Sequence, residues 1–257
     1  MKIAVQTRPW GPERNRNDLS GILAEIAGAG YDGFEIGAQH LDLAHPSAFR
    51  QLLDAYGLDV VGVHVGGEIY DPKSVADALE NLGLAVEFAV AVGASFLPFS
   101  GKLKENKSET EMRNQAESLN KIGALAKDAG LTLAYHNHFW EIQDDAAELH
   151  YLMDHTDPAV VSFCLDVAWV YRGGGDPAAV VEELLAKERI AYFHLKDTTE
   201  DEWKELGRGV VDLPAIMRVI EAHGYDGWLV VEQDETQREP VESARISRNY
   251  LHEILNV

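Results

Sequence analysis

Four short apolar runs in the second half of the chain end in ionisable side chains. These groups fall within residues 135–141, 163–169, 193–197 and 230–234. Alternate residues of a strand share a face, which pairs His136 with His138, His194 with Lys196, and Glu232 with Asp234. A charged group pointing into an apolar interior is costly unless it is paired or bound to a metal. A mixed set of carboxylates and imidazoles suits a divalent ion such as Mn²⁺, Mg²⁺, Co²⁺ or Zn²⁺. The four runs together therefore predict a metal site.

Simpler interpretations exist for each of these residues taken alone. A set of structural ion pairs would also place charged groups together. Two earlier apolar runs add Glu35 and His64, and a lone histidine at a strand end is more often a satisfied core residue than a ligand. The prediction of a metal site depends on the coincidence of polar groups over four consecutive strands.

The elements that must position these groups follow one repeating pattern. Short runs rich in Val, Ile and Phe alternate with amphipathic stretches that end in Gly, and eight such runs can be counted along residues 1–257. Nearly continuous apolar runs are typical of parallel strands buried on both faces. Eight strand–helix units predict an α/β fold, a single (β/α)₈ TIM barrel spanning 1–257, with its active site at the carboxyl ends of the strands. A doubly wound sheet is the alternative, but Arg8-Pro9-Trp10-Gly11 after the first run is no Gly-rich phosphate loop.

Charge and composition exclude several classes of partner. The 257 residues contain 22 Lys and Arg against 43 Asp and Glu, a net charge of −21. Such a surface repels nucleic-acid backbones and anionic membranes, and no apolar run approaches the roughly 20 residues of a membrane helix. The single cysteine, Cys164, permits no internal disulfide and suits a reducing compartment. We expect a cytoplasmic protein whose partner is a small molecule, with a homo-oligomer left open.

A set of segments in fixed order carries a family resemblance. The segments YHNHFWE, LDVAWVYRGGGDP, HLKD, ELGRG and VVEQD resemble those of the sugar phosphate isomerase/epimerase family of xylose-isomerase-like TIM barrels. The subgroup with a YHNH signature is especially similar, and relatives include inosose dehydratases, inosose isomerases and ketose 3-epimerases. The resemblance extends over essentially the whole chain. It is specific for the fold and the metal site and says little about the substrate.

The resemblance implies one divalent ion per chain, with Mn²⁺ expected first. Its ligands by this resemblance are Glu141, Asp166, His194 and Glu232. At the fifth strand two alternatives stay open, because many relatives carry a glutamate where this chain has His136. Either His136 takes the ligand position or Glu141 reaches back from the loop. We favour Glu141.

Catalytic and substrate-binding roles are expected around this ion. Glu232 is expected to act as both ligand and acid/base, with Glu141 or His138 as the opposing group. Lys196 either lies beside the substrate oxygens or pairs with Asp197. The remaining candidates for contact with substrate are His64, His136, Trp10, Trp140, Trp169 and Arg208. Core packing explains any one of the tryptophans equally well, and Arg208 could be a surface charge.

These features predict an enzyme, a divalent-metal-dependent isomerase or epimerase of a small sugar or polyhydroxy ketone. The expected chemistry is proton abstraction and a metal-stabilised enediolate. The first alternative is a lyase, either an inosose dehydratase or an enzyme that eliminates from a 3-keto sugar. An abasic-site endonuclease would need a basic groove, which the net charge of −21 disfavours. A non-catalytic binding protein is the remaining alternative.

Overall fold

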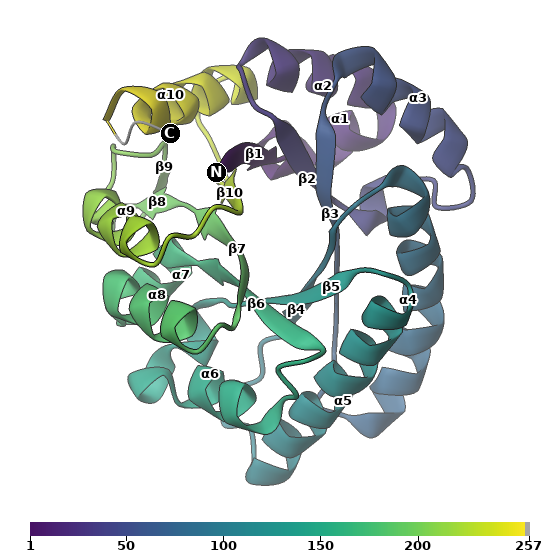
Figure 1. Ribbon diagram of the computed structural model, residues 1–257, viewed down its shortest axis with the longest axis vertical. Coiled ribbons are helices and arrows are strands. Elements are labelled where there is room, and N and C mark those ends of the chain that lie inside the picture. The colour runs from purple at the N-terminus through teal and green to yellow at the C-terminus, as the bar shows by residue number, and fades with distance from the viewer. Residues whose placement is uncertain (255–257) are drawn as a thin grey trace.

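In the computed structural model, parallel strands close into a barrel and helices surround it (Figure 1). The structure describes residues 1–254, with no side-chain description at 76–78, 80, 81 and 254. The last three residues of the expected domain, 255–257, therefore lie outside the described residues. Around the barrel the strands follow the order β1-β10-β7-β6-β5-β4-β3-β2, so each strand pairs with its sequence neighbours and β10 closes on β1. This order confirms the (β/α)₈ barrel and excludes the doubly wound sheet.

The strands coincide with the predicted apolar runs to within a few residues. Those of the barrel are β1 (Lys2–Gln6), β2 (Gly33–Gly37), β3 (Asp59–Gly67), β4 (Phe96–Gly101), β5 (Thr132–His136), β6 (Val161–Asp166), β7 (Ile190–Leu195) and β10 (Trp228–Val231). A short hairpin, β8 (Asp197–Thr198) with β9 (Trp203–Lys204), follows β7 and was not expected from the sequence. It brings Trp203 toward the carboxyl end of the barrel.

Helices connect successive strands and cover the outside of the barrel. They are α1 (Gly11–Asn17), α2 (Leu19–Gly28), α3 (Pro46–Tyr56), α4 (Pro72–Val92), α5 (Glu109–Asp128), α6 (Gln143–His155), α7 (Val167–Arg172), α8 (Pro177–Ala186), α9 (Leu213–Ala222) and α10 (Pro240–Ile254). Short 3₁₀ turns η1 (Arg8–Trp10), η2 (Ala38–His40) and η3 (Phe139–Glu141) follow β1, β2 and β5. Within residues 1–254, no helix combines the length and apolarity that crossing a membrane requires.

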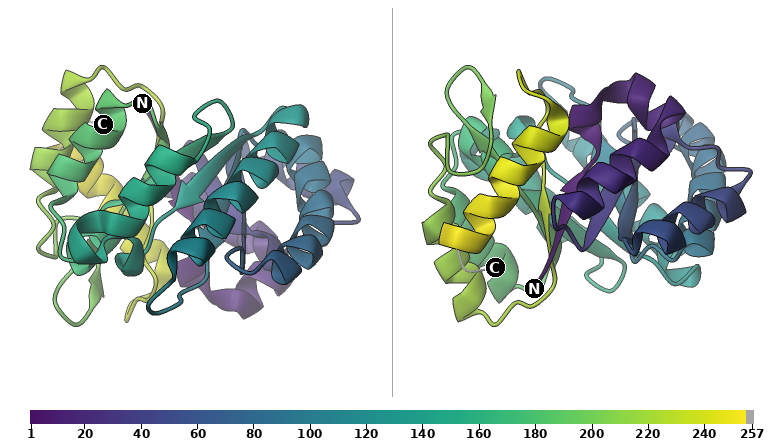
Figure 2. Two further views of the ribbon diagram at one scale, coloured as in Figure 1. Left: turned by 90° about the horizontal axis from the view of Figure 1, so that it is seen from below. Right: turned by 90° about the horizontal axis from the view of Figure 1, so that it is seen from above.

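The last helix completes the outer ring beside the first ones. Figure 2 shows α10 alongside α2, and the Tyr31 hydroxyl donates a hydrogen bond of 2.8 Å to the carbonyl oxygen of Ala244 in α10. This contact joins the segment after α2 to α10, outside the place where β1 pairs with β10 and closes the barrel.

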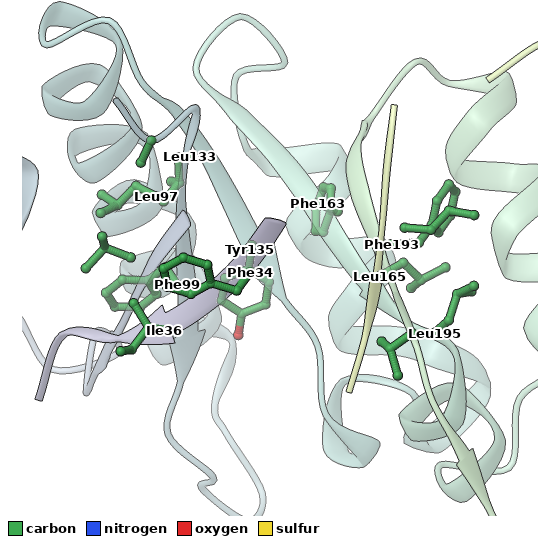
Figure 3. Packing of buried hydrophobic residues seen from close by; sticks show 14 of the residues in the cluster. Phe34, Ile36, Leu97, Phe99, Leu133, Tyr135, Phe163, Leu165, Phe193 and Leu195 are labelled. Atoms are coloured by element: carbon green, nitrogen blue, oxygen red, sulfur yellow. The ribbon is translucent and has the colours of Figure 1, made fainter. Parts of the chain in front are cut away.

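The apolar core has two parts, one on each side of the barrel wall. Outward-facing strand residues such as Leu133, Tyr135, Phe163 and Leu195 pack in a large cluster with the helices (Figure 3). A smaller cluster fills the barrel interior and consists of Ala4, Val61, Ala134, Cys164, Tyr192 and Val230. Strand alternation explains this division. It also predicts that residues two positions after the inner ones point inward as well, one layer nearer the carboxyl end.

Candidate active site

Four ionisable side chains converge at the carboxyl end of the barrel. His136 ends β5, Asp166 ends β6, His194 lies in β7 and Glu232 follows β10. One potential ligand atom from each lies within 4.8 Å of the others, and all four residues are buried. Each stands two positions after a residue of the inner apolar cluster. The strand register thus brings together groups that lie about 100 residues apart in the chain.

Asp166 is held by the start of the helix that follows it. Its Oδ1 accepts hydrogen bonds from the backbone N–H groups of Ala168 and Trp169, at 3.0 and 2.9 Å, and so caps α7. Asn137 fixes its backbone, accepting from Asp166 N–H at 2.8 Å and donating to the Asp166 carbonyl at 3.3 Å. Because Oδ1 is committed to the helix, Oδ2 is left to face the cluster. The sequence assigned Asn137 no role, although it lies between two predicted site histidines.

Two buried atoms in the cluster lack hydrogen-bond partners among the described residues. They are Nε2 of His136 and Oδ2 of Asp166, which lie 3.6 Å apart. Nε2 of His136 is also 3.5 Å from Oε2 of Glu232, which in turn lies 2.8 Å from Nδ1 of His194. Buried polar atoms are rarely left unsatisfied. Imidazole and carboxylate groups aimed at one point fit a divalent ion held among them.

Lys196 brings a buried cation beside the same carboxylates. Its Nζ lies 3.4 Å from Oδ2 of Asp166, 3.5 Å from Oε2 of Glu232 and 2.7 Å from Oδ2 of Asp234. It also lies above the rings of two tryptophans, Trp169 at 5.0 Å and Trp203 at 4.2 Å.

Asp197, the partner for Lys196 that the sequence also suggested, instead accepts hydrogen bonds from backbone N–H groups of its own loop. Lys196 therefore pairs with Asp234 rather than with Asp197, and it lies beside two of the potential metal ligands.

Mutual attraction sets the charge states in this cluster. Burial alone would raise the pKa of Glu232, but Lys196 and His194 outweigh it and hold that pKa well below its ordinary value. Burial opposes the charged forms of His194 and Lys196, yet the neighbouring carboxylates raise the pKa of each. The raised pKa favours the ammonium form of Lys196. His138 differs, because burial and the nearby cations lower its pKa to about 2 and keep it neutral.

Glu141 is not brought to the cluster. The turn η3 directs its buried carboxylate back along β5, where Oε1 accepts from the Tyr135 hydroxyl at 2.6 Å and Oε2 from the backbone N–H of His138 at 2.8 Å. Tyr135 belongs to the outer cluster, so Glu141 lies on the outer side of the strand. Of the two alternatives at the fifth strand, the geometry supports His136 rather than the favoured Glu141. Burial, reinforced by the charge of Glu148, raises the pKa of Glu141 to about 7.

A cavity of about 590 Å³ opens above the cluster. Its lining includes His64, His136, His138, Trp140, Trp169 and Glu232. The imidazole of His138 stacks on Trp140 with ring centroids 4.3 Å apart. This wall of aromatic rings opposite charged groups suits a molecule that has both an apolar face and several oxygens.

Two expected substrate contacts lie elsewhere. Trp10 is buried in the outer core, and its indole N–H donates to Glu25 of α2 at 2.6 Å. Arg208 is exposed in the loop after the β8–β9 hairpin. Neither residue lines the cavity. The core-packing interpretation of Trp10 and the surface-charge interpretation of Arg208 are the ones that the geometry supports.

Glu35 is a second buried residue near the site to which the sequence assigned no role. It lies in β2 between Phe34 and Ile36, with an exposed fraction of 0%. Its carboxylate contacts His64, Tyr192 and His194. Burial would raise its pKa, but His194 and His64 outweigh that effect and keep it well below the ordinary range. A lone glutamate between two large apolar residues of a buried strand was the available sequence signal.

Comparison with known proteins decides the family. The model of the family described as xylose isomerase-like TIM barrel matches residues 23–254 of this chain. The chain belongs to the xylose isomerase-like TIM barrel family. This confirms the resemblance found in the sequence.

The proteins and solved structures that resemble this chain carry different names. An inosose dehydratase of Clostridium perfringens is 27% identical, the match covering 94% of this chain and 91% of that protein. A sugar phosphate isomerase/epimerase from Parabacteroides distasonis superposes with a TM-score of 0.82 at 23% identity, covering 98% and 94% of the two chains. The IolI protein with a bound zinc atom superposes with a TM-score of 0.80 at 14% identity, covering 100% and 98%. Family and fold are thereby established, and the relatives divide between lyase and isomerase names.

Proposed function

We propose that this protein is a divalent-metal-dependent isomerase or epimerase of a small polyhydroxy ketone. The observation that carries the proposal is the buried convergence of His136, Asp166, His194 and Glu232 beneath a cavity with aromatic walls. Its imidazole and carboxylate donors suit a transition-metal or related divalent ion, and the zinc atom in the similar IolI structure is consistent with such a site. Mn²⁺ remains our first expectation for the native ion.

Bound there, a divalent ion would polarise a substrate carbonyl and acidify the neighbouring C–H group. The residues around it supply the remaining functions. The Lys196 ammonium, 3.5 Å from Oε2 of Glu232, can stabilise negative charge that develops on a substrate oxygen. Glu232 lines the cavity and, as an ionised carboxylate, can accept the proton from carbon.

An epimerase needs a second proton carrier on the opposite face of the substrate. Glu141, one of the two predicted candidates, is occupied by Tyr135 and the backbone of His138 on the outer side of β5. His138 lines the cavity on the fifth-strand side, and its buried Nδ1 lacks a hydrogen-bond partner among the described residues. We therefore assign the second role to His138, which can relay a proton between substrate and solvent.

A second candidate function is the dehydration of an inosose. The observation in its favour is the match to inosose dehydratases over more than nine-tenths of the chain. Loss of a β-hydroxyl group needs the same first proton abstraction. It then needs an acid beside the departing hydroxyl, a role in which the Lys196 ammonium could serve.

Proton NMR in D₂O with ketoses, inososes and 3-keto sugars separates these outcomes. Deuterium incorporated at one carbon with retention of all hydroxyl groups indicates isomerisation or epimerisation. A product that has lost water indicates the dehydratase. The Glu232→Gln variant, loaded with metal, is the matched control and should show neither. Absence of exchange with all three substrate classes would contradict the proposed function.

A further inference from the structure

One buried carboxylate connects the two histidines of the cluster from the opposite half of the barrel mouth. Oε2 of Glu35 lies 2.9 Å from Nε2 of His194, and Oε1 lies 2.8 Å from Nδ1 of His64. Nε2 of His64 lies 2.8 Å from the hydroxyl of Ser100, and that hydroxyl lies 3.4 Å from Nδ1 of His136. Glu35 thus reaches His194 directly and His136 through two intermediate side chains.

In each of the two histidines, one ring nitrogen faces the cluster and the other faces Glu35 or Ser100. His194 directs Nδ1 toward Glu232 and Nε2 toward Glu35. His136 directs Nε2 toward Asp166 and Glu232, and Nδ1 toward Ser100. A histidine that binds a metal through one nitrogen commonly donates the N–H of the other to a carboxylate or a hydroxyl group, which fixes the ring and its tautomer. The geometry meets this requirement for both rings.

The fold builds this contact from strands on the far side of the barrel. Glu35 comes from β2, His64 from β3 and Ser100 from β4. The register of β2 against β3 shifts by one residue between Phe34 and Glu35, and such irregularities commonly redirect a side chain. Glu35 is fully buried and is held by a third donor, the Tyr192 hydroxyl at 2.6 Å. A carboxylate buried with three donors is fixed in position, as an anchor must be.

We propose that Glu35 is the common positioning residue of the metal site, orienting His194 directly and His136 through His64 and Ser100. The inference rests on the proposed metal-binding function. It assigns opposite tautomers to the two ligands, so that His194 binds through Nδ1 and keeps a proton on Nε2, whereas His136 binds through Nε2 and keeps a proton on Nδ1. Glu35 itself does not touch the metal or the substrate.

Long-range ¹H–¹⁵N NMR of the Zn²⁺-loaded wild-type protein tests the tautomers without any variant. The expected spectrum shows a protonated Nε2 for His194 and a protonated Nδ1 for His136. A protonated Nδ1 on His194, or the same tautomer for both residues, would overturn the proposal. Failure of the wild type to bind one Zn²⁺ ion at this cluster would overturn the proposed function together with the inference.

Competition with a chelator measures how much Glu35 contributes to Zn²⁺ affinity. Glu35→Gln should weaken Zn²⁺ binding by roughly 10- to 100-fold, the usual effect of losing an outer partner of a metal ligand. Tyr192→Phe is the matched control. It removes the hydrogen bond from Tyr192 to the Glu35 oxygen that also contacts His194, and it leaves the contacts of Glu35 with both imidazole rings in place. It should change the affinity by no more than about threefold, well under that range.

The variants also separate positioning from general packing. If Glu35→Gln binds Zn²⁺ with the affinity of the wild type, Glu35 is not the positioning residue, although the metal site itself is retained. Equal losses in Glu35→Gln and Tyr192→Phe would assign the effect to packing and likewise refute the positioning role. If Glu35→Gln does not fold, Ser100→Ala decides, because it interrupts only the path to His136. It should shift the His136 ring nitrogen signals while leaving those of His194 unchanged, and unchanged His136 signals would count against the proposal.

Discussion

The two halves of the barrel mouth carry different kinds of polar group. Strands β5, β6, β7 and β10 contribute the four potential ligands and Lys196. Strands β2, β3 and β4 contribute Glu35, His64 and Ser100, which hydrogen-bond to one another and to the two histidines of the other half. The four potential ligands each lie two positions after a residue of the inner apolar cluster.

If the cluster binds a metal as we propose, the two sides of the mouth have different parts in holding it. Ligands on four adjacent strands face one point, but two of them are rings that can rotate and change tautomer. The opposite half supplies fixed hydrogen-bond partners that hold those rings. Mutations in the late-strand half should therefore remove the site, whereas mutations in the early-strand half should weaken it.

The largest effect is expected from His136→Ala. Removing this imidazole should reduce metal affinity by more than the roughly 100-fold that marks the upper range for outer partners, because a ligand atom is lost from the cluster. Elemental analysis after gentle purification measures the metal content. Glu141→Gln is the matched comparison and should retain the metal. The reverse result would restore Glu141 as the ligand of the fifth strand.

Glu232→Gln should reduce turnover by roughly 10²- to 10⁴-fold, the usual contribution of general acid–base catalysis. The amide keeps an oxygen that can bind the metal and loses the basic carboxylate, so metal content should be largely retained. Deuterium exchange in the metal-loaded variant is the measurement. Near-normal exchange would move the base to another residue of the cavity, such as His138.

The smallest effect is expected at Glu141, which follows β5 but lies outside the cluster. It is an effect on stability and not on the metal site. The pKa of Glu141 is raised to about 7 in the folded protein, so folding favours its protonated form. This contribution to stability is fully present below about pH 4.5, declines as the pH rises and is lost above about pH 7. A pKa shift of this size corresponds to a change in unfolding free energy of about 3 to 4 kcal/mol, at roughly 1.4 kcal/mol per pH unit.

Glu141→Gln should remove that pH dependence. Relative to the variant, the wild type should lose unfolding free energy between about pH 4.5 and 7 and then stay level, because glutamine does not titrate. Urea denaturation at several pH values in this window provides the measurement. Parallel stability curves for the two proteins would show that this carboxyl group is not protonated on folding.

Many features of the site could be predicted from the chain alone. Asp166, His194, Glu232 and Lys196 could be singled out because each ends or follows a short apolar run, and the barrel follows from the repetition of such runs. Strand alternation indicates which residues share a face. Local hydrophobic pattern is sufficient for these conclusions, since it depends only on residues close together in the sequence, whereas the roles of Asp166, His194 and Glu232 as ligands came from the family resemblance.

The candidate ligand of the fifth strand and the contacts of Glu35 become apparent only in the tertiary structure. Glu141 and His136 are both suitable ligands by residue type, and the choice depends on the direction of turn η3, which sends Glu141 to Tyr135 on the outer side. Glu35 acquires partners 29 and 159 residues away, in His64 and His194. Barrel closure and the register shift in β2 create those contacts, and neither leaves a mark in the local sequence, because each depends on how distant strands pair.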